Sequence, residues 1–245
     1  MSARTVEGEN ISDGWLGACA TLLASPGHET THLVMRMSSP LPEDPTVREN
    51  VDTLLRAAKA QDIVEVRNTI FPAGIAEDYP EPAELADAYM EDYAVLRQLG
   101  SPTGTYFGRI CRYPTADGGS TAQLTKTVAK LREYKGGKHW RARYQINIYA
   151  SEKDAKTYRG FPCMAHLCFQ LAGPHPPERL DCLALYRNQD MIRKGYGNLL
   201  GLAELQRYIA AATGLQSGEL TVIAGHADMK LNKRTRALLE ALLDR

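Results

Sequence analysis

The sequence has 245 residues, enough for one domain with a substantial apolar core, and we expect a single domain over residues 1–245. Its 29 basic residues balance its 29 acidic residues, so no overall charge favours nucleic acid or an anionic membrane as a partner. No apolar stretch approaches the roughly 18 residues of a membrane span, and the first residues lack a signal-peptide pattern. We therefore expect a cytoplasmic protein that binds neither nucleic acid nor membrane.

The cysteines predict reduced thiols. They are odd in number, irregularly spaced and without a CxxC pair, and they stand at Cys19, Cys111, Cys163, Cys168 and Cys182. This pattern predicts neither a disulfide framework nor a zinc site, and it leaves one thiol as a candidate nucleophile.

The first hundred residues predict alternating helices and strands. Apolar spacing predicts helices over residues 15–24 and 47–61, and alternation predicts strands over 32–37 and 62–71. A further helix is predicted over residues 84–99, with Gly100 as its stop.

The remainder predicts three strands before a long helix. A connecting segment without regular structure leads to Tyr113 and Pro114, and a helical stripe follows at residues 124–131. Strands are predicted at 141–149, 164–171 and 180–186 because these segments alternate or are rich in β-formers.

The clearest helix is predicted to begin with Asn198 as its N-cap and to end at Gly214. A short strand at residues 220–224 and a helix at about 233–243 complete the chain. Since helices and strands do not alternate strictly, the pattern predicts an α+β fold with a mixed sheet.

A cluster of polar residues downstream of Cys163 indicates a binding site. A free cysteine is most often a small buried apolar residue, but Pro162-Cys163 here stands at the head of a predicted strand. Downstream, Arg187, Asn188, Asp190 and Asn198 lie where a strand ends and the strongest helix begins. Such groups suit a phosphate and the amide-like edge of a base.

These residues resemble the thymidylate synthase and deoxycytidylate hydroxymethylase superfamily in order and spacing. The shared features, in chain order, are GTYFGRICRYPTADGG, Pro162-Cys163, Tyr186-Arg187, Asp190, Asn198 eight residues later, TGLQSGEL, Gly225 and Asn232. The resemblance implies a mixed β-sheet flanked by helices and a homodimer in which two sheets stack face to face. It also implies 5,10-methylenetetrahydrofolate as cofactor and a pyrimidine nucleotide monophosphate as substrate.

The resemblance implies roles for individual residues. Cys163 would be the nucleophile that adds to C6 of the pyrimidine, and Arg187 would bind the phosphate and lower the pKa of the thiol. Asn198 would pair with the O4 and N3–H edge of uracil. Asn188 and Asp190 would line the base and phosphate pocket.

Further phosphate contacts are implied from the partner subunit, for which Arg141 and Arg143 lie in the right segment. Which of the two would serve is not set by spacing.

The sequence also departs from the family pattern. Asp228 and Lys230 stand where the family has the His and Tyr that bind the sugar, so either ribose or deoxyribose is expected. Phe107 stands where the family has an active-site Tyr, with Tyr106 beside it.

The family's proton-shuttle glutamate has three candidates by neighbourhood alone, Glu49, Glu65 and Glu84.

Three classes of function are therefore weighed. The first is one-carbon transfer to C5 of a uridylate-type nucleotide, giving a methyl group or, if water attacks, a hydroxymethyl group. The second is a homologue that only binds a nucleotide. The third, a cysteine hydrolase with His166 or His226 as base, is disfavoured because no Cys-His-Asn order is evident.

Overall fold

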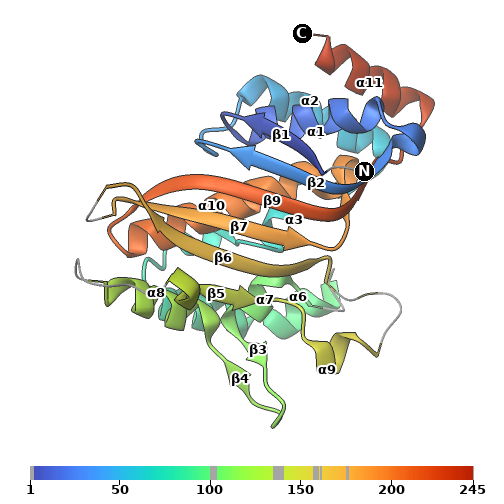
Figure 1. The fold of residues 1–245 in the computed structure, drawn as a ribbon. Coiled ribbons are helices and arrows are strands. Elements are labelled where there is room, and N and C mark those ends of the chain that lie inside the picture. Colours follow the sequence, from blue (N-terminus) through green and yellow to red (C-terminus); the bar gives the residue numbers. More distant parts are fainter. Residues whose placement is uncertain are drawn as a thin grey trace.

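The computed structural model describes residues 3–99, 104–134, 141–156, 160, 162–174 and 177–244. Its main sheet is mixed and has the strand order β1-β2-β9-β7-β6-β5, with β8 added beside β9. The strands of this sheet are β1 (Arg4–Gly8), β2 (Glu29–Met37), β5 (Gln145–Asn147), β6 (Met164–Ala172), β7 (Arg179–Tyr186), β8 (Gln189–Asp190) and β9 (Gln216–Asp228). A separate ribbon, β3 (Tyr113–Pro114) with β4 (Ser120–Thr121), projects away from the body (Figure 1).

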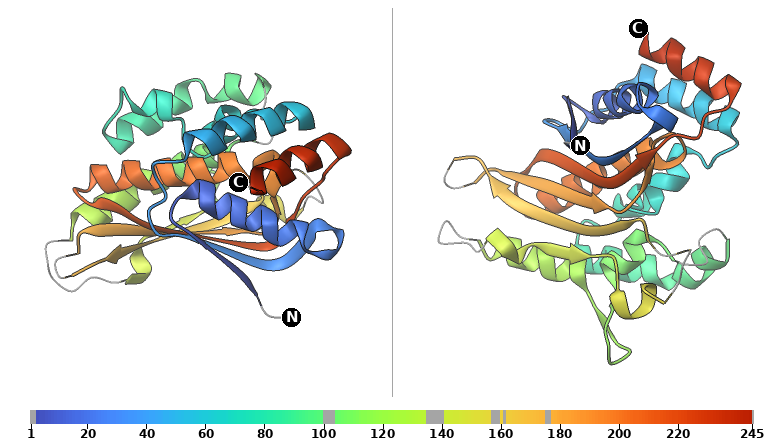
Figure 2. Two further views of the ribbon diagram at one scale, coloured as in Figure 1. Left: turned by 90° about the horizontal axis from the view of Figure 1, so that it is seen from above. Right: turned by 45° about the vertical axis from the view of Figure 1, so that its right-hand side comes forward.

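The helices gather on one face of the sheet, as the left view of Figure 2 shows. They are α1 (Ile11–Leu23), α2 (Pro45–Ala58), α3 (Ile63–Asn68), α4 (Ala73–Ala76), α5 (Pro82–Glu91), α6 (Tyr93–Leu99), α7 (Tyr106–Cys111), α8 (Gln123–Arg132), α9 (Ser151–Asp154), α10 (Tyr196–Ala212) and α11 (Lys233–Leu243). This arrangement confirms the expected mixed sheet flanked by helices.

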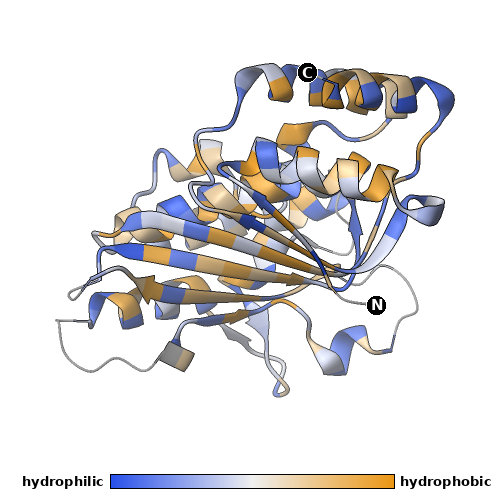
Figure 3. Ribbon diagram, turned by 45° about the horizontal axis from the view of Figure 1, so that its top comes forward, coloured by the Kyte–Doolittle hydropathy of each residue, from blue (hydrophilic) through white to orange (hydrophobic). Residues whose placement is uncertain are grey.

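The sheet has a covered face and an open face because its strands alternate. Along β7, buried Leu180, Cys182, Ala184 and Tyr186 face the helices, while the residues between them are half-buried or exposed. In Figure 3 the strands are accordingly banded with hydrophobic and hydrophilic residues. The core lies between the covered face and the helices.

Helix α10 packs closely on α3, and glycines permit this. A Cβ added to Gly197 would lie 2.6 Å from the Val66 Cβ, and one added to Gly201 would lie 2.9 Å from the Arg67 carbonyl oxygen. Any larger residue at either position would push the two helices apart. The contact fixes the position of α3, and with it Glu65, relative to α10.

The segment predicted as a strand at residues 62–71 is helical, so this prediction was wrong. Asp62 caps α3 by accepting a hydrogen bond from the Glu65 amide at 2.7 Å. The buried residues Ile63, Val66 and Ile70 follow helical spacing. The β-branched residues favoured a strand, but burial against α10 and the cap outweigh that preference.

Other boundaries also differ from the sequence-based prediction. The segment expected to be irregular before Tyr113 contains α7, and the helix predicted over residues 84–99 is broken at Asp92 into α5 and α6. The strand predicted over residues 141–149 is reduced to β5, with a 3₁₀ turn before it. Conversely, β9 is 13 residues long rather than five.

Candidate active site

Cys163 lies immediately before β6 and is half-buried against the core. Its carbonyl oxygen accepts a hydrogen bond from the Arg187 amide at 2.8 Å. The Arg187 side chain returns to the same segment, because its Nε donates to the Pro162 carbonyl oxygen at 3.2 Å. The nucleophile segment and the end of β7 are therefore held together, and an exposed guanidinium lies beside the cysteine.

Tyr106, the first residue of α7, lies against Cys163. The pKa of the Tyr106 hydroxyl is raised to about 12, mainly by burial and also by the neighbouring Cys163 side chain. Hydrogen bonds from the backbone of Met164 and Cys163 oppose this rise. The ring also meets Tyr186 edge-on, with centroids 6.4 Å apart. Tyr186 is fully buried, and its hydroxyl has no hydrogen-bond partner among the described residues.

Phe107 does not reach this site, although the resemblance to the family implied that it would. Its side chain is fully buried and packs edge-on against Phe71 and Tyr89. Because adjacent residues of a helix point in directions about 100° apart, the chain can present only one of the pair to Cys163. That residue is Tyr106, to which the role considered for Phe107 passes.

A π-helical turn at Met191–Gly195 brings Lys194 to the site. Asp190 caps this turn by accepting from the Arg193 amide at 2.9 Å. The Lys194 ammonium donates to the Gln61 side-chain oxygen. Burial lowers the pKa of Lys194, and the charges of Asp190, Glu65 and Cys163 act in the opposite direction.

Lys194 is a site residue that the sequence analysis did not find. It is half-buried and lies within electrostatic reach of both Cys163 and Glu65. The signal in the sequence was weak, because one lysine before an apolar helix is usually a solvated charge. Of the three candidate glutamates, only Glu65 is among the charges that affect the pKa of Lys194.

Asn198 lies inside α10 and is not its N-cap, so that prediction was wrong. The helix continues directly from the π turn, and Asn198 is its third residue. Its side chain is 4% exposed, and Nδ2 donates to the Gln189 Oε1 at 3.2 Å. Gln189 was not singled out from the sequence. Its side chain is 1% exposed, and its Nε2 has no partner among the described residues.

Asp190 and Asp228 are neighbours across the parallel pair of β8 and β9. Burial raises the pKa of Asp228, the charge of Asp190 raises it further, and Lys230 and His226 lower it. Asp228 Oδ1 is buried and has no hydrogen-bond partner in the described part of the chain. Lys230 is exposed. These carboxylates lie at the same sheet edge as Asn188, but among the described residues they make no hydrogen bond to it.

The two histidines considered as bases make their contacts with residues other than Cys163. His226 Nδ1 contacts the Asn188 Oδ1 at 2.6 Å, and its Nε2 lies 3.5 Å from Glu29. His166 contacts side chains of β5, at 2.6 Å to Gln145 and 2.9 Å to Asn147. Neither ring has a hydrogen bond to Cys163 among the described residues, so nothing supports a cysteine–histidine hydrolase.

Of the two arginines expected to serve a partner subunit, Arg143 is not part of this cluster. Arg143 donates to Glu133 at 2.9 Å, and both side chains are exposed. The Arg141 side chain lies outside the described part. Their role across a dimer stays a prediction.

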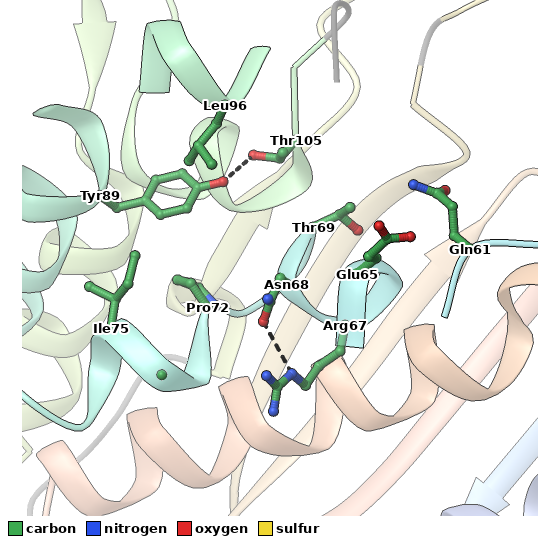
Figure 4. A pocket seen from close by; sticks show the side chains of 11 residues that line it. Gln61, Glu65, Arg67, Asn68, Thr69, Pro72, Ile75, Tyr89, Leu96 and Thr105 are labelled. Atoms are coloured by element: carbon green, nitrogen blue, oxygen red, sulfur yellow. Dashed lines mark hydrogen bonds between the residues drawn. The ribbon is translucent and has the colours of Figure 1, made fainter. Parts of the chain in front are cut away.

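A pocket of about 460 Å³ adjoins Glu65 and Gln61. Figure 4 shows those two side chains at one end and Tyr89, Leu96 and Ile75 at the other. Its lining residues are Gln61, Glu65, Arg67, Asn68, Thr69, Pro72, Gly74, Ile75, Tyr89, Leu96 and Thr105. The pocket thus has an apolar part suited to a flat ring and a polar part that leads towards Lys194 through Gln61.

Metal-binding clusters and membrane-spanning helices can be assessed for the described residues. No group of three or more His, Cys, Asp and Glu side chains there is arranged to hold a metal ion. No described helix is long and apolar enough to cross a bilayer.

A half-buried thiol beside an arginine, a lysine and a tyrosine at the end of a mixed sheet is typical of a site built for a cysteine nucleophile. The thymidylate synthase family model matches residues 83–245, and the chain belongs to this family.

A relative in Methanopyrus kandleri, named "Putative thymidylate synthase", is 29% identical over 153 residues. The match covers 62% of this chain and 66% of that protein, so the chain spans just under two thirds of the relative's length.

Proposed function

We propose that the protein transfers a one-carbon unit to C5 of a uridylate-type nucleotide through a covalent bond between Cys163 and C6. The observation that carries this proposal is the position of Cys163 among Arg187, Lys194 and Tyr106. Arg187 and Lys194 bring two positive charges to this part of the chain, and the thiolate is the reactive form of cysteine. Arg187 also offers a guanidinium for the nucleotide phosphate.

The chemistry follows from the electrons of the base. The Cys163 sulfur forms a bond to C6, and the C5=C6 electron pair moves through C5 and C4 to O4. The enolate would attack the one-carbon unit through C5, and removal of the C5 proton by a base would expel the nitrogen of the donor and leave a methylene group on C5. Addition of a hydride, or of water with loss of a proton, to that methylene would restore the C5=C6 double bond as the Cys163 thiolate leaves C6. Lys194 lies where its ammonium can stabilise negative charge near Cys163.

The proposed one-carbon donor is 5,10-methylenetetrahydrofolate, which supplies the carbon and, for a methyl product, a hydride. The pocket beside Glu65 fits such a molecule, because Pro72, Ile75, Tyr89 and Leu96 give it an apolar wall. Gln61 connects that pocket to the site by accepting a hydrogen bond from Lys194. The pocket thus supports a second ligand next to the nucleotide.

We assign the proton transfer to Glu65, which lines the pocket and acts on Lys194. Glu65→Gln is expected to lower release of tritium from C5-labelled nucleotide by roughly 10²- to 10⁴-fold. Glu49→Gln and Glu84→Gln are matched controls, since both side chains are exposed and neither lines the pocket. Equal losses in all three variants would exclude Glu65 from the role.

Hydroxymethylation is the second candidate. Gln61 and Glu65 form the polar end of the pocket, and Lys194 donates a hydrogen bond to Gln61. A water molecule held there would be available to attack the one-carbon unit. The mass of the product separates the two outcomes by one oxygen. If UMP, dUMP, CMP and dCMP all release no tritium but raise the melting temperature, the protein binds nucleotides without turnover.

We further propose a homodimer formed through the open face of the sheet. Leu185 is 39% exposed there, and half-buried Leu183, Ile223 and Cys168 extend the same face. Pairing of two such faces would bury this apolar surface and would bring Arg141 and Arg143 towards the partner's site. Light scattering should give the mass of two chains, and the mass of one chain would contradict the arrangement.

A further inference from the structure

We propose that Gln189 is a specificity-determining residue, which together with Asn198 forms a two-amide unit that selects uracil over cytosine. This inference rests on the function proposed above and assigns a role to a residue outside the sequence motif. It starts from a buried amide that lacks a partner. Gln189 is 1% exposed, and its Nε2 meets no acceptor among the described residues. Buried polar groups are nearly always hydrogen-bonded, so an exception requires an explanation.

The other end of Gln189 is occupied. Its Oε1 accepts from the Asn198 Nδ2 at 3.2 Å. No described residue donates to the Asn198 Oδ1. Besides the second N–H of Asn198, the pair therefore leaves Gln189 Nε2 as a donor next to Asn198 Oδ1 as an acceptor.

Both amides belong to segments that are connected to the Cys163 segment. Gln189 is two residues beyond Arg187, whose amide is bonded to the Cys163 carbonyl oxygen. The pairing of β8 with β9 sets Gln189 opposite the fully buried Ala227 and turns its side chain inward. Asn198 follows Lys194 by one helical turn, and Lys194 is influenced by Cys163.

The donor and acceptor match the edge of uracil. Uracil presents O4 as an acceptor next to N3–H as a donor, whereas cytosine presents an amino group next to an unprotonated N3. A lone asparagine can turn its amide over and satisfy either edge. The bond from Asn198 Nδ2 to Gln189 Oε1 couples the two amides, so that the Asn198 amide cannot turn over alone without losing it. In the arrangement observed, Asn198 Oδ1 is left for N3–H and Gln189 Nε2 for O4.

The test is the ratio of dissociation constants for uridine and cytidine monophosphates, each as ribose and deoxyribose forms, measured by calorimetry. The wild-type chain should prefer the uracil nucleotide. Gln189→Met keeps the side-chain volume but removes both polar atoms. It should weaken uridylate binding by roughly tenfold and bring the ratio close to one, because the Asn198 amide is then free to turn.

Gln206→Met is the matched control. Gln206 is also fully buried, but its Nε2 is already bonded to the carbonyl oxygens of Leu180 and Glu219. This variant should lose stability without changing the ratio. Because the ratio compares two ligands on one protein, it does not depend on overall stability. Gln189→Ala serves as a second variant if the methionine variant does not fold.

The outcomes separate the two proposals. If the wild-type chain binds none of the four nucleotides, the proposed function fails and this inference fails with it. If it binds them and Gln189→Met leaves the ratio unchanged, the two-amide unit is wrong and the proposed function stands. If the wild-type chain prefers cytidylate, both the two-amide unit and the uridylate substrate are wrong.

Discussion

Serine at position 163 is expected to abolish C5 tritium release, by about four orders of magnitude or more. A hydroxyl is hardly ionised at neutral pH, so the cations beside it have no anion to stabilise. The variant should still bind the nucleotide, because Arg187, Gln189 and Asn198 are unchanged. Thermal shift with UMP and dUMP checks binding, and tritium release checks the chemical step.

Cys168→Ser is the matched control for this experiment. Cys168 is also half-buried but lies within β6, where its sulfur contacts the side-chain amides of Gln145 and Gln170. We expect it to keep near wild-type turnover. Loss of activity in Cys168→Ser and not in Cys163→Ser would show that Cys168, and not Cys163, is the nucleophile.

The largest effect on stability is expected from Asp154→Ala. Asp154 and Arg109 form a buried bidentate pair, at 2.5 and 2.8 Å, with side chains that are 4% and 10% exposed. Removing the carboxylate leaves the guanidinium buried and without its partner, which typically costs about 3–5 kcal/mol. Urea unfolding of the wild-type chain and the variant measures the difference.

Asp87→Ala provides the comparison. Arg112, the residue that follows the same helix, pairs with Asp87 at the surface at 3.3 Å, and the carboxylate is 75% exposed. Such exposed pairs contribute about 1 kcal/mol or less. Similar losses in both variants would contradict a special role for the buried pair.

The pH dependence of the Asp154 pair has a definite sign. Burial raises the pKa of Asp154, but hydrogen bonds from Arg109 and from the Ala150 amide outweigh it, so the net pKa is lowered. Its stabilisation is therefore present above the unfolded pKa and is lost as pH falls through the folded value. Wild type should lose this contribution below about pH 4, and Asp154→Ala should not show it.

The buried pair also bears on the site. Arg109 belongs to α7, whose first residue is Tyr106, and its second contact is the Ile148 carbonyl oxygen beyond β5. Asp154→Ala should therefore make the position of Tyr106 against Cys163 less fixed, and it should lower turnover as well as stability.

Local signals predicted much of the fold. Residues 233–243 form α11 as expected, and the strands at β6 and β7 match within one residue at each end. Periodicity suffices there because each element buries one regular face. It failed at residues 62–71, where β-branched residues suggested a strand. The Asp62 cap and packing against Gly197 and Gly201 explain the helix that forms instead.

The site was predictable where a motif carried it and was not where side-chain direction decided. Cys163 and Arg187 were named from their order in the chain, and the structure joins them through a backbone bond. Phe107 and Tyr106 could not be distinguished without the rotation of α7. Lys194 and Gln189 carry no recognisable spacing, and three-dimensional contact alone reveals them.

The π turn at Met191–Gly195 has a consequence for how this chain can tolerate change. It links Asp190, fixed to β9, with Asn198, fixed within α10. Adding or deleting one residue in that link would swing the Asn198 amide by about 100° around the helix axis. The eight-residue step sets the spacing between these two packed elements, so the number of residues inside it can hardly vary.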